Sequence, residues 1–167
     1  MDKNNLLILG AGQYGYLARE TAEAMGCFGT IAFLDDNNPA ALGKLEAYQS
    51  FLQDYDCSFV AMGNPQLRMQ WLKKLEDAGF VLPALIHPCA YVSPSAVLGI
   101  GTMVEPMAVV HTEARVEAGG LLCAGSVVNH NAHVMGCCQI DCNAVVAANA
   151  VVPEGTKVMS GTVFERR

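Results

Sequence analysis

The chain has 167 residues, 52% of them apolar, and its ten Lys and Arg against sixteen Asp and Glu give a net charge of -6. An acidic chain without a basic cluster argues against a nucleic-acid backbone as its main partner. No apolar run approaches the roughly 18 residues that span a bilayer, no secretory signal is visible at the start, and seven cysteines without a CxxC pair fit a reducing compartment. We therefore expect a cytoplasmic protein with no membrane span.

The first 83 residues predict a small α/β domain. An apolar strand at 6–9 is followed by a glycine turn and a helical pattern through Leu17, Thr21 and Ala24 that stops at Gly26. Strands are expected at 31–34 and 58–62, a second helix with Leu67 on its apolar face runs from 65 to Gly79, and 80–82 is a candidate fourth strand. This order predicts a parallel sheet with right-handed crossovers.

A GxGxxG motif occupies residues 10–15, directly after the first predicted strand. Its glycines allow a phosphate to approach the start of the helix, and Asp35, at the end of the second strand, is placed to accept from a ribose or a base. The other reading is a tight structural turn beside solvated acids. Because the domain is only half of a dinucleotide fold, a mononucleotide or nucleotide-sugar suits it better than a dinucleotide.

Residues 84–167 form a second domain built on a six-residue repeat. From Ile86 to Val163, thirteen units each begin with an aliphatic residue and carry a small residue four places later, and Gly or Asn precedes the small residue in most units. Two buried positions and one turn in every six residues do not fit a helix. The pattern predicts short strands joined by corners, with three units to an eighteen-residue coil and about four coils in all.

Two histidines mark the corners of this repeat. His130 lies at a corner, so its side chain should leave the prism, and His111 lies one coil earlier on the same face. A solvated surface residue is the alternative reading for both. We expect His133 to be a surface residue and His87 to be structural.

Four sequence features together resemble a known family: the hexapeptide run, NHN at 129–131, GAGxxG at 10–15, and FLDD at 33–36 with GNP at 63–65. The chain is similar to the nucleotide-sugar acetyltransferases of bacterial glycan synthesis, namely the sialic acid O-acetyltransferase family and the related UDP-4-amino-sugar N-acetyltransferases. The resemblance implies a Rossmann-like half-domain followed by a left-handed parallel β-helix. It also implies a homotrimer that holds acetyl-CoA between adjacent β-helices and a nucleotide-sugar in the first domain.

The resemblance also assigns roles to residues. His130 would be the general base for a sugar amine or hydroxyl, Asn131 stands where relatives usually have an acid, and the N–H of Ala148 replaces that of a family glycine as donor to the thioester oxygen. The residues implied in CoA binding are His111, Gln139 and Ala148. Those implied in nucleotide-sugar binding are Gly10, Gly12, Tyr14, Gly15, Asp35, Asp36 and Asn64.

We therefore expect an acetyl-CoA-dependent acetyltransferase acting on a nucleotide-linked sugar. The alternative is a noncatalytic trimeric scaffold or nucleotide sensor that has lost CoA binding, because Asn131 replaces the acid and the repeat ends about one coil before that of the relatives. A metal hydratase built on hexapeptide trimers would need three well-spaced histidines, and His111, His130 and His133 do not have that spacing. Cys123 and Cys142 fit small filler residues better than a metal site, so we expect no metal.

Overall fold

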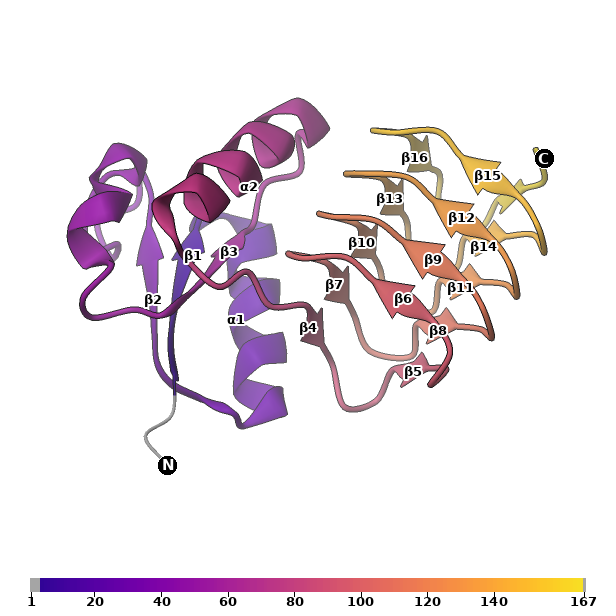
Figure 1. The fold of residues 1–167 in the computed structure, drawn as a ribbon, viewed down its shortest axis with the longest axis horizontal. Helices are drawn as coiled ribbons and strands as arrows, with labels where there is room; N and C mark the ends of the chain where they lie inside the picture. The colour runs from indigo at the N-terminus through magenta and orange to yellow at the C-terminus, as the bar shows by residue number, and fades with distance from the viewer. Residues whose placement is uncertain (1–3, 167) are drawn as a thin grey trace. The chain divides into compact units, whose positions relative to one another are not determined.

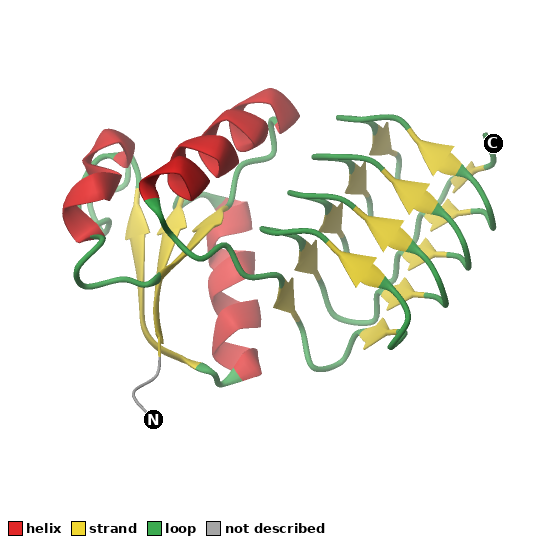
Figure 2. Cartoon of the chain, in the orientation of Figure 1, coloured by secondary structure: helices red, strands yellow, loops and turns green. Residues whose placement is uncertain are grey.

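The computed structural model describes residues 4–166 and divides the chain into two compact units, Met1–Pro83 and Ala84–Arg167. All the helices of the described residues lie in the first unit, while the second consists of short strands and turns (Figure 2). None of the helices within residues 4–166 is long and apolar enough to cross a membrane.

The first unit is a three-stranded parallel sheet with the order β2-β1-β3 (Figure 1). The strands are β1 (Asn4–Leu9), β2 (Phe28–Leu34) and β3 (Cys57–Val60), and the helices are α1 (Gln13–Met25), the 3-10 helix η1 (Leu45–Phe51) and α2 (Pro65–Ala78). The run from Leu6 to Leu9 is fully buried because β1 is the central strand. This arrangement confirms the predicted Rossmann-like half-domain.

The helices end where the sequence predicts. Helix α1 stops at Gly26 and α2 stops at Gly79, both in the left-handed conformation with φ of 66° and 97°. Asn64 caps α2 through its side chain, which accepts from the N–H of Leu67 at 2.9 Å, and Pro65 follows at the first helical position.

Two details of this unit differ from expectation. Residues 80–82 form no further strand, because only Val81 makes an isolated parallel bridge, to Cys57. The helix faces also differ. Leu17 and Leu67 are 40% and 48% exposed, whereas small residues of α1, such as Ala18, are buried. Of the residues expected on the buried face of α1, Thr21 is buried, whereas Leu17 and Ala24 are exposed. Small side chains let a helix approach the sheet closely, and hydropathy does not register them.

The second unit is a left-handed parallel β-helix of about four coils in which a strand begins every six residues. Its strands are β4 (Leu85–Ile86), β5 (Tyr91–Val92), β6 (Val97–Leu98), β7 (Met103–Val104), β8 (Val109–Val110), β9 (Arg115–Val116), β10 (Leu121–Leu122), β11 (Val127–Val128), β12 (His133–Val134), β13 (Gln139–Ile140), β14 (Val145–Val146), β15 (Val151–Val152), β16 (Lys157–Val158) and β17 (Val163–Phe164). They form three parallel sheets, with the orders β16-β13-β10-β7-β4, β17-β14-β11-β8-β5 and β15-β12-β9-β6 (Figure 1). Each sheet is one face of the prism.

The repeat pattern explains both the core and the corners. The aliphatic residue of each unit and the small residue four places later make the core, as Val128 and Ala132 illustrate at 1% exposure each. Every corner Gly or Asn that the pattern selects has a positive φ, and so do three residues that do not favour it: Met107, Glu113 and Cys137. The corner geometry is therefore imposed by the coil even where the residue type opposes it.

One face of the prism carries an apolar column on its outer side. Along the sheet β17-β14-β11-β8-β5, five residues lie in register and all are at least partly exposed: Tyr91, Val109, Val127, Val145 and Val163. We call these five residues the valine column. Such a continuous apolar surface is typical of an interface with another protein chain.

Candidate functional site

The glycine loop after β1 is built by close backbone approaches. Gly10 has a φ of 102° and lies where a Cβ would meet the carbonyl oxygen of Ala61 at 2.8 Å, and a Cβ at Gly15 would collide with the carbonyl of Gly10. Gly12, in contrast, faces open space. Gly10 and Gly15 are therefore required by the fold, while Gly12 leaves the start of α1 uncovered.

The start of α1 can receive an anion. Gly12 is its N-cap, so no side chain caps the helix, and its first turn contains no acidic residue. The first N–H groups of a helix have no partner within the helix and carry partial positive charge. A phosphate group is the kind of ligand that such a helix start binds.

Asp35 holds this loop in place. Its Oδ2 accepts from the N–H of Ala11 at 2.7 Å, and its Oδ1 accepts from the N–H groups of Asn37 and Asn38 at 2.8 and 2.9 Å. The hydrogen bond from Ala11 is the main cause that lowers the pKa of the Asp35 carboxyl. Asn38, which sequence reasoning missed, donates in turn to the carbonyl of Ala11 at 3.0 Å. The expected contact of Asp35 with a nucleotide stays a prediction, because in this structure the carboxylate serves the loop.

The loop after β3 lies beside the glycine loop. A Cβ added at Gly63 would lie 3.4 Å from the ring of Tyr14, so the two loops touch at this point. Asn64 is the cap of α2, and Asp36, which is exposed, accepts from the N–H of Leu45 at 3.1 Å. The structure thus places Tyr14, in the first turn of α1, beside the loop that leads to Asn64 at the start of α2.

Arg68 holds the loop after β3 through hydrogen bonds to its backbone. This residue was not identified from the sequence. Its side chain is fully buried, and its guanidinium donates to the carbonyls of Met62 and Gly63 at 2.6 and 3.2 Å. The only signal is its spacing, because Arg68 lies three residues before Trp71 and so shares the buried face of α2. An arginine in an apolar stripe indicates a guanidinium that binds backbone carbonyls.

In the second unit, His130 is exposed at the corner between β11 and β12. Asn129 accepts from the N–H of His130 through Oδ1 at 2.8 Å, and Asn131 has a φ of 57° and an amide Nδ2 lying 3.1 Å from Nδ1 of His130. The ring is therefore held from its Nδ1 side, while Nε2 has no hydrogen bond to any of the described residues. For Nε2 to act as a general base, Nδ1 must carry the ring hydrogen, and this requires the oxygen of the Asn131 amide, not its nitrogen, beside Nδ1.

Ala148 lies on the next coil, eighteen residues after His130. The coils are tied at this corner because Asn149 donates its N–H to the carbonyl of His130 at 3.2 Å. The N–H of Ala148 itself donates to no acceptor within residues 4–166. A donor without a partner next to a candidate base can stabilise a developing oxyanion.

The other two residues implied in CoA binding, His111 and Gln139, lie on different parts of the β-helix. His111 is exposed at the same corner as His130, one coil earlier. Gln139 is 7% exposed on β13, in a different sheet, and its Nε2 donates to Sγ of Cys123 at 3.9 Å. A single chain therefore brings His111, His130 and Ala148 to one edge of the prism and leaves Gln139 on another face.

Glu105 lies on the same side of the β-helix as Gln139. It is 6% exposed, and burial raises the pKa of its carboxyl although the N–H of Ala124 donates to it at 3.0 Å. Neither Cys123 nor Cys142 forms a disulfide with another described residue, and the first is buried while the second is exposed. In the part of the chain that the structure describes, no three His, Cys, Asp or Glu residues are grouped to hold a metal.

The chain is similar to known acetyltransferases in sequence. Residues 5–75 match the family described as the PglD N-terminal domain. The UDP-N-acetylbacillosamine N-acetyltransferase of Bacillus subtilis (strain 168) is 32% identical over 110 residues, a segment that makes up 60% of this chain and 50% of that relative. The chain thus matches about half the length of this curated relative.

The fold is shared with solved structures over nearly the whole chain. The acetyltransferase domain of PglB from Neisseria gonorrhoeae FA1090 superimposes with a TM-score of 0.94 at 30% identity, over 98% of this chain and 83% of that one. The same domain has been solved in complex with acetyl coenzyme A, with a TM-score of 0.92. PerB from Caulobacter crescentus, in complex with CoA and GDP-perosamine, shares the fold with a TM-score of 0.75 at 24% identity, over 97% of this chain and 92% of that one. The resemblance inferred from the sequence is thereby confirmed: the chain belongs to the PglD-like family of acetyltransferases.

Proposed function

We propose that this protein transfers the acetyl group of acetyl-CoA to an amino group of a nucleotide-linked sugar. The observation that carries the proposal is the corner at His130, where an imidazole with an open Nε2 lies one coil from the unpartnered N–H of Ala148. The name of the Bacillus relative describes N-acetyl transfer, and the Neisseria domain binds acetyl coenzyme A. These names support an amine as acceptor and acetyl-CoA as donor.

In the proposed reaction, the sugar amine attacks the thioester carbonyl carbon while Nε2 of His130 takes a proton from the amine. The carbonyl oxygen becomes an oxyanion, to which the N–H of Ala148 donates. When the C–S bond breaks, the sulfur of CoA leaves and takes the proton from the imidazolium. The products are the acetylated sugar and free CoA, and His130 is neutral again.

Asn131 sets which nitrogen of His130 is the base. For Nε2 to accept a proton, Nδ1 of the neutral ring must carry the hydrogen. In the orientation described, Nδ2 of Asn131 lies 3.1 Å from Nδ1. Turning the amide by half a turn puts its oxygen there, where it accepts from Nδ1–H and does the orienting task of the usual family acid.

The glycine loop is the proposed binding site for the nucleotide. The uncapped start of α1, opened by Gly12, would hold a phosphate, and the neighbouring loops with Tyr14, Asp36 and Asn64 would contact the remaining parts of the nucleotide-sugar. Gly10, Gly15 and Asp35 act by shaping this loop.

We also propose that the protein is a homotrimer. The valine column gives each chain an apolar face that another copy would cover. Gln139 and His130 lie in different parts of the prism, so they can serve one CoA site only if they come from two copies.

The proposal is tested by incubating the protein with acetyl-CoA and a panel of UDP-amino-sugars and their hydroxyl counterparts. We expect release of free CoA together with an acetylated amino-sugar. The scaffold or sensor alternative predicts instead that calorimetry detects UDP binding without binding of acetyl-CoA at millimolar concentration. Tight binding of acetyl-CoA would exclude that alternative.

A further inference from the structure

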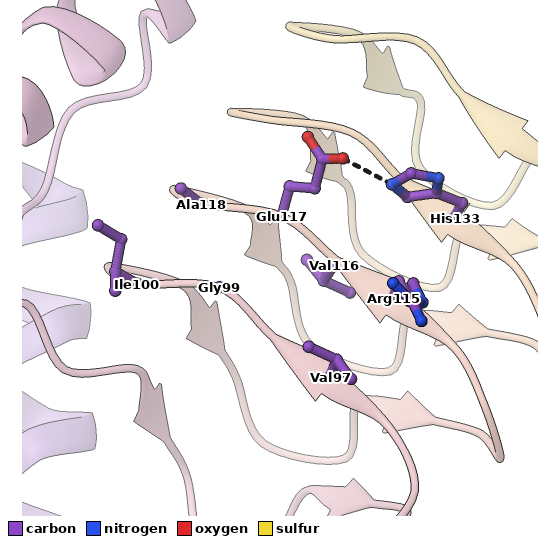
Figure 3. A pocket seen from close by; sticks show the side chains of 8 residues that line it. All are labelled: Val97, Gly99, Ile100, Arg115, Val116, Glu117, Ala118 and His133. Carbon is purple, nitrogen blue, oxygen red and sulfur yellow. Dashed lines mark hydrogen bonds and ion pairs between the residues drawn. The ribbon is translucent and has the colours of Figure 1, made fainter.

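A pocket of about 370 Å³ lies on the outer side of the sheet β15-β12-β9-β6, within the β-helix. Its walls include Val97, Gly99, Ile100, Arg115, Glu117 and His133 (Figure 3). This volume is at the lower end of the range for small-molecule sites. His130, Ala148 and Gln139 are not among the lining residues, so the proposed acetyl-transfer site does not account for this pocket.

Gly99 creates the hollow. At the equivalent position one coil later the chain has Glu117, whose side chain rises beside the pocket, while Gly99 leaves that space open (Figure 3). A Cβ at Gly99 would also collide with the backbone of Glu117 and Ala118. The backbone of two successive coils therefore approaches closely at Gly99, where a side chain has no room.

Arg115 supplies a positive charge that no acid neutralises. Between residues 84 and 165 the only Lys or Arg residues are Arg115 and Lys157, and Lys157 is paired with Asp141 at 3.2 Å. The two acids nearest in sequence are Glu113 and Glu117, and neither forms an ion pair with Arg115 among the described residues. The Oε1 atom of Glu117 lies 2.7 Å from Nε2 of His133, and its Oε2 accepts from the N–H of Gly136 at 3.0 Å. Arg115 is exposed and has no ion-pair partner among the described residues.

Apolar side chains line the pocket at both ends, Val97 beside Arg115 and Ile100 at the far end near Ala118 (Figure 3). Val97, directly below Arg115 in the strand register, is 54% exposed, and Ile100 is 39% exposed. Removing exposed aliphatic surface from water lowers the free energy, so a ligand with an apolar part would be favoured here. A bare inorganic anion would leave them uncovered, and a cation would be repelled by Arg115.

We propose that this pocket binds a small organic carboxylate on a short apolar stem, with the carboxylate on Arg115 and the stem over Val97 and Ile100. The guanidinium offers two parallel N–H donors that match a carboxylate. Both carboxylate oxygens of Glu117 already have hydrogen-bond partners, His133 and Gly136, so Glu117 does not compete with the ligand for Arg115. The site is independent of the proposed acetyl transfer.

The test is an NMR titration of the full chain with hexanoate, inorganic phosphate and hexylammonium, followed at the methyl groups of Val97 and Ile100. We expect saturable shifts with hexanoate, with a Kd on the order of 1 mM, and none with the other two probes. Arg115→Gln should weaken hexanoate binding by about tenfold or more, because a charge-assisted hydrogen bond is lost. Arg115→Lys should retain part of the affinity.

Lys157→Gln is the matched control, since it removes the other Lys or Arg between residues 84 and 165 and should leave hexanoate binding unchanged. Equal binding of hexanoate by the wild type and the folded Arg115→Gln variant would overturn the proposal. Binding of phosphate or hexylammonium as strong as that of hexanoate would also overturn it.

Discussion

At the scale of single residues, the most informative side chain is Asn131. Its left-handed backbone explains why Asn suits the corner, and its amide explains how His130 can be oriented without an acid. The price of this choice is electrostatic, since an amide stabilises the imidazolium less than a carboxylate does.

Replacing Asn131 with Asp should therefore change the pH dependence of catalysis. A carboxylate beside Nδ1 favours the protonated ring, so the acid limb of the kcat/KM profile should move to higher pH, and the plateau rate should be equal to or above that of the wild type. The measurement is the pH profile of acetyl transfer. Asn143→Asp is the control, because Asn143 has the same positive φ at another corner and its variant should keep the wild-type profile. If the Asn131→Asp variant kept the wild-type pH profile, the side chain at position 131 would have no influence on the catalytic base.

At the scale of elements, Asp35 shows how one carboxylate couples β2 to the loop between β1 and α1. Because hydrogen bonds from Ala11, Asn37 and Asn38 lower its pKa in the folded state, the ionised form favours folding. This contribution is present at pH values above the carboxyl's ordinary pKa of 3.8 and is lost as the pH falls through the lowered folded value.

Asp35→Asn should accordingly lower the free energy of unfolding at neutral pH by roughly 1 to 3 kcal/mol, through weaker hydrogen bonds to the loop. The difference from the wild type should shrink at acid pH, where Asp35 is protonated as well. Chemical denaturation at both pH values measures this. Asp36→Asn is the control, because Asp36 is exposed and accepts from the N–H of Leu45, at the start of η1, and from no described residue of the glycine loop. A variant as stable as the wild type at neutral pH would show that Asp35 does not hold the loop.

The elements also show what a sequence can predict. The β-helix follows from local information, since each six-residue unit carries its own two core positions and corner, and the structure confirms both at residues such as Val128 and Asn131. The helix caps at Asn64, Gly26 and Gly79 are equally local. The buried face of α1 is predicted correctly at Thr21 but not at Leu17, because Ala18 and Gly15 pack by being small, which hydropathy does not register.

Long-range hydrogen bonds of side chains could not be predicted from the sequence. Asn38 reaches Ala11 across 27 residues, and His133 meets Glu117 across 16. The sequence does not show that Arg115 lacks an ion-pair partner, because this depends on Glu117 binding His133 and Gly136. Such features depend on which partner a side chain selects among several within reach, and spacing along the chain does not determine that selection.

At the scale of the whole molecule, the proposed trimer makes a direct prediction. Val127 lies at the centre of the valine column, between Val109 and Val145. Val127→Glu would bury a charge in the interface, which is costly, so the mass measured by light scattering should fall from three times 17.8 kDa to a single chain. Acetyl transfer should fall with it, because the proposed CoA site would take Gln139 from another copy. Val97→Glu, on a different sheet, is the control and should stay trimeric. A monomeric wild type would contradict the trimer outright.

The central claim is that His130 is the base of an acetyl transfer, and one measurement tests it most directly: kcat for acetyl transfer from acetyl-CoA to the accepted amino-sugar, compared between the wild type and His130→Ala. His130 is exposed at its corner, so its replacement should leave the fold intact and leave acetyl-CoA binding within a few-fold of the wild type. We predict that kcat falls by roughly a hundredfold to ten thousandfold, the usual contribution of a positioned general base. A His130→Ala variant that transfers acetyl groups at the wild-type rate would contradict the mechanism.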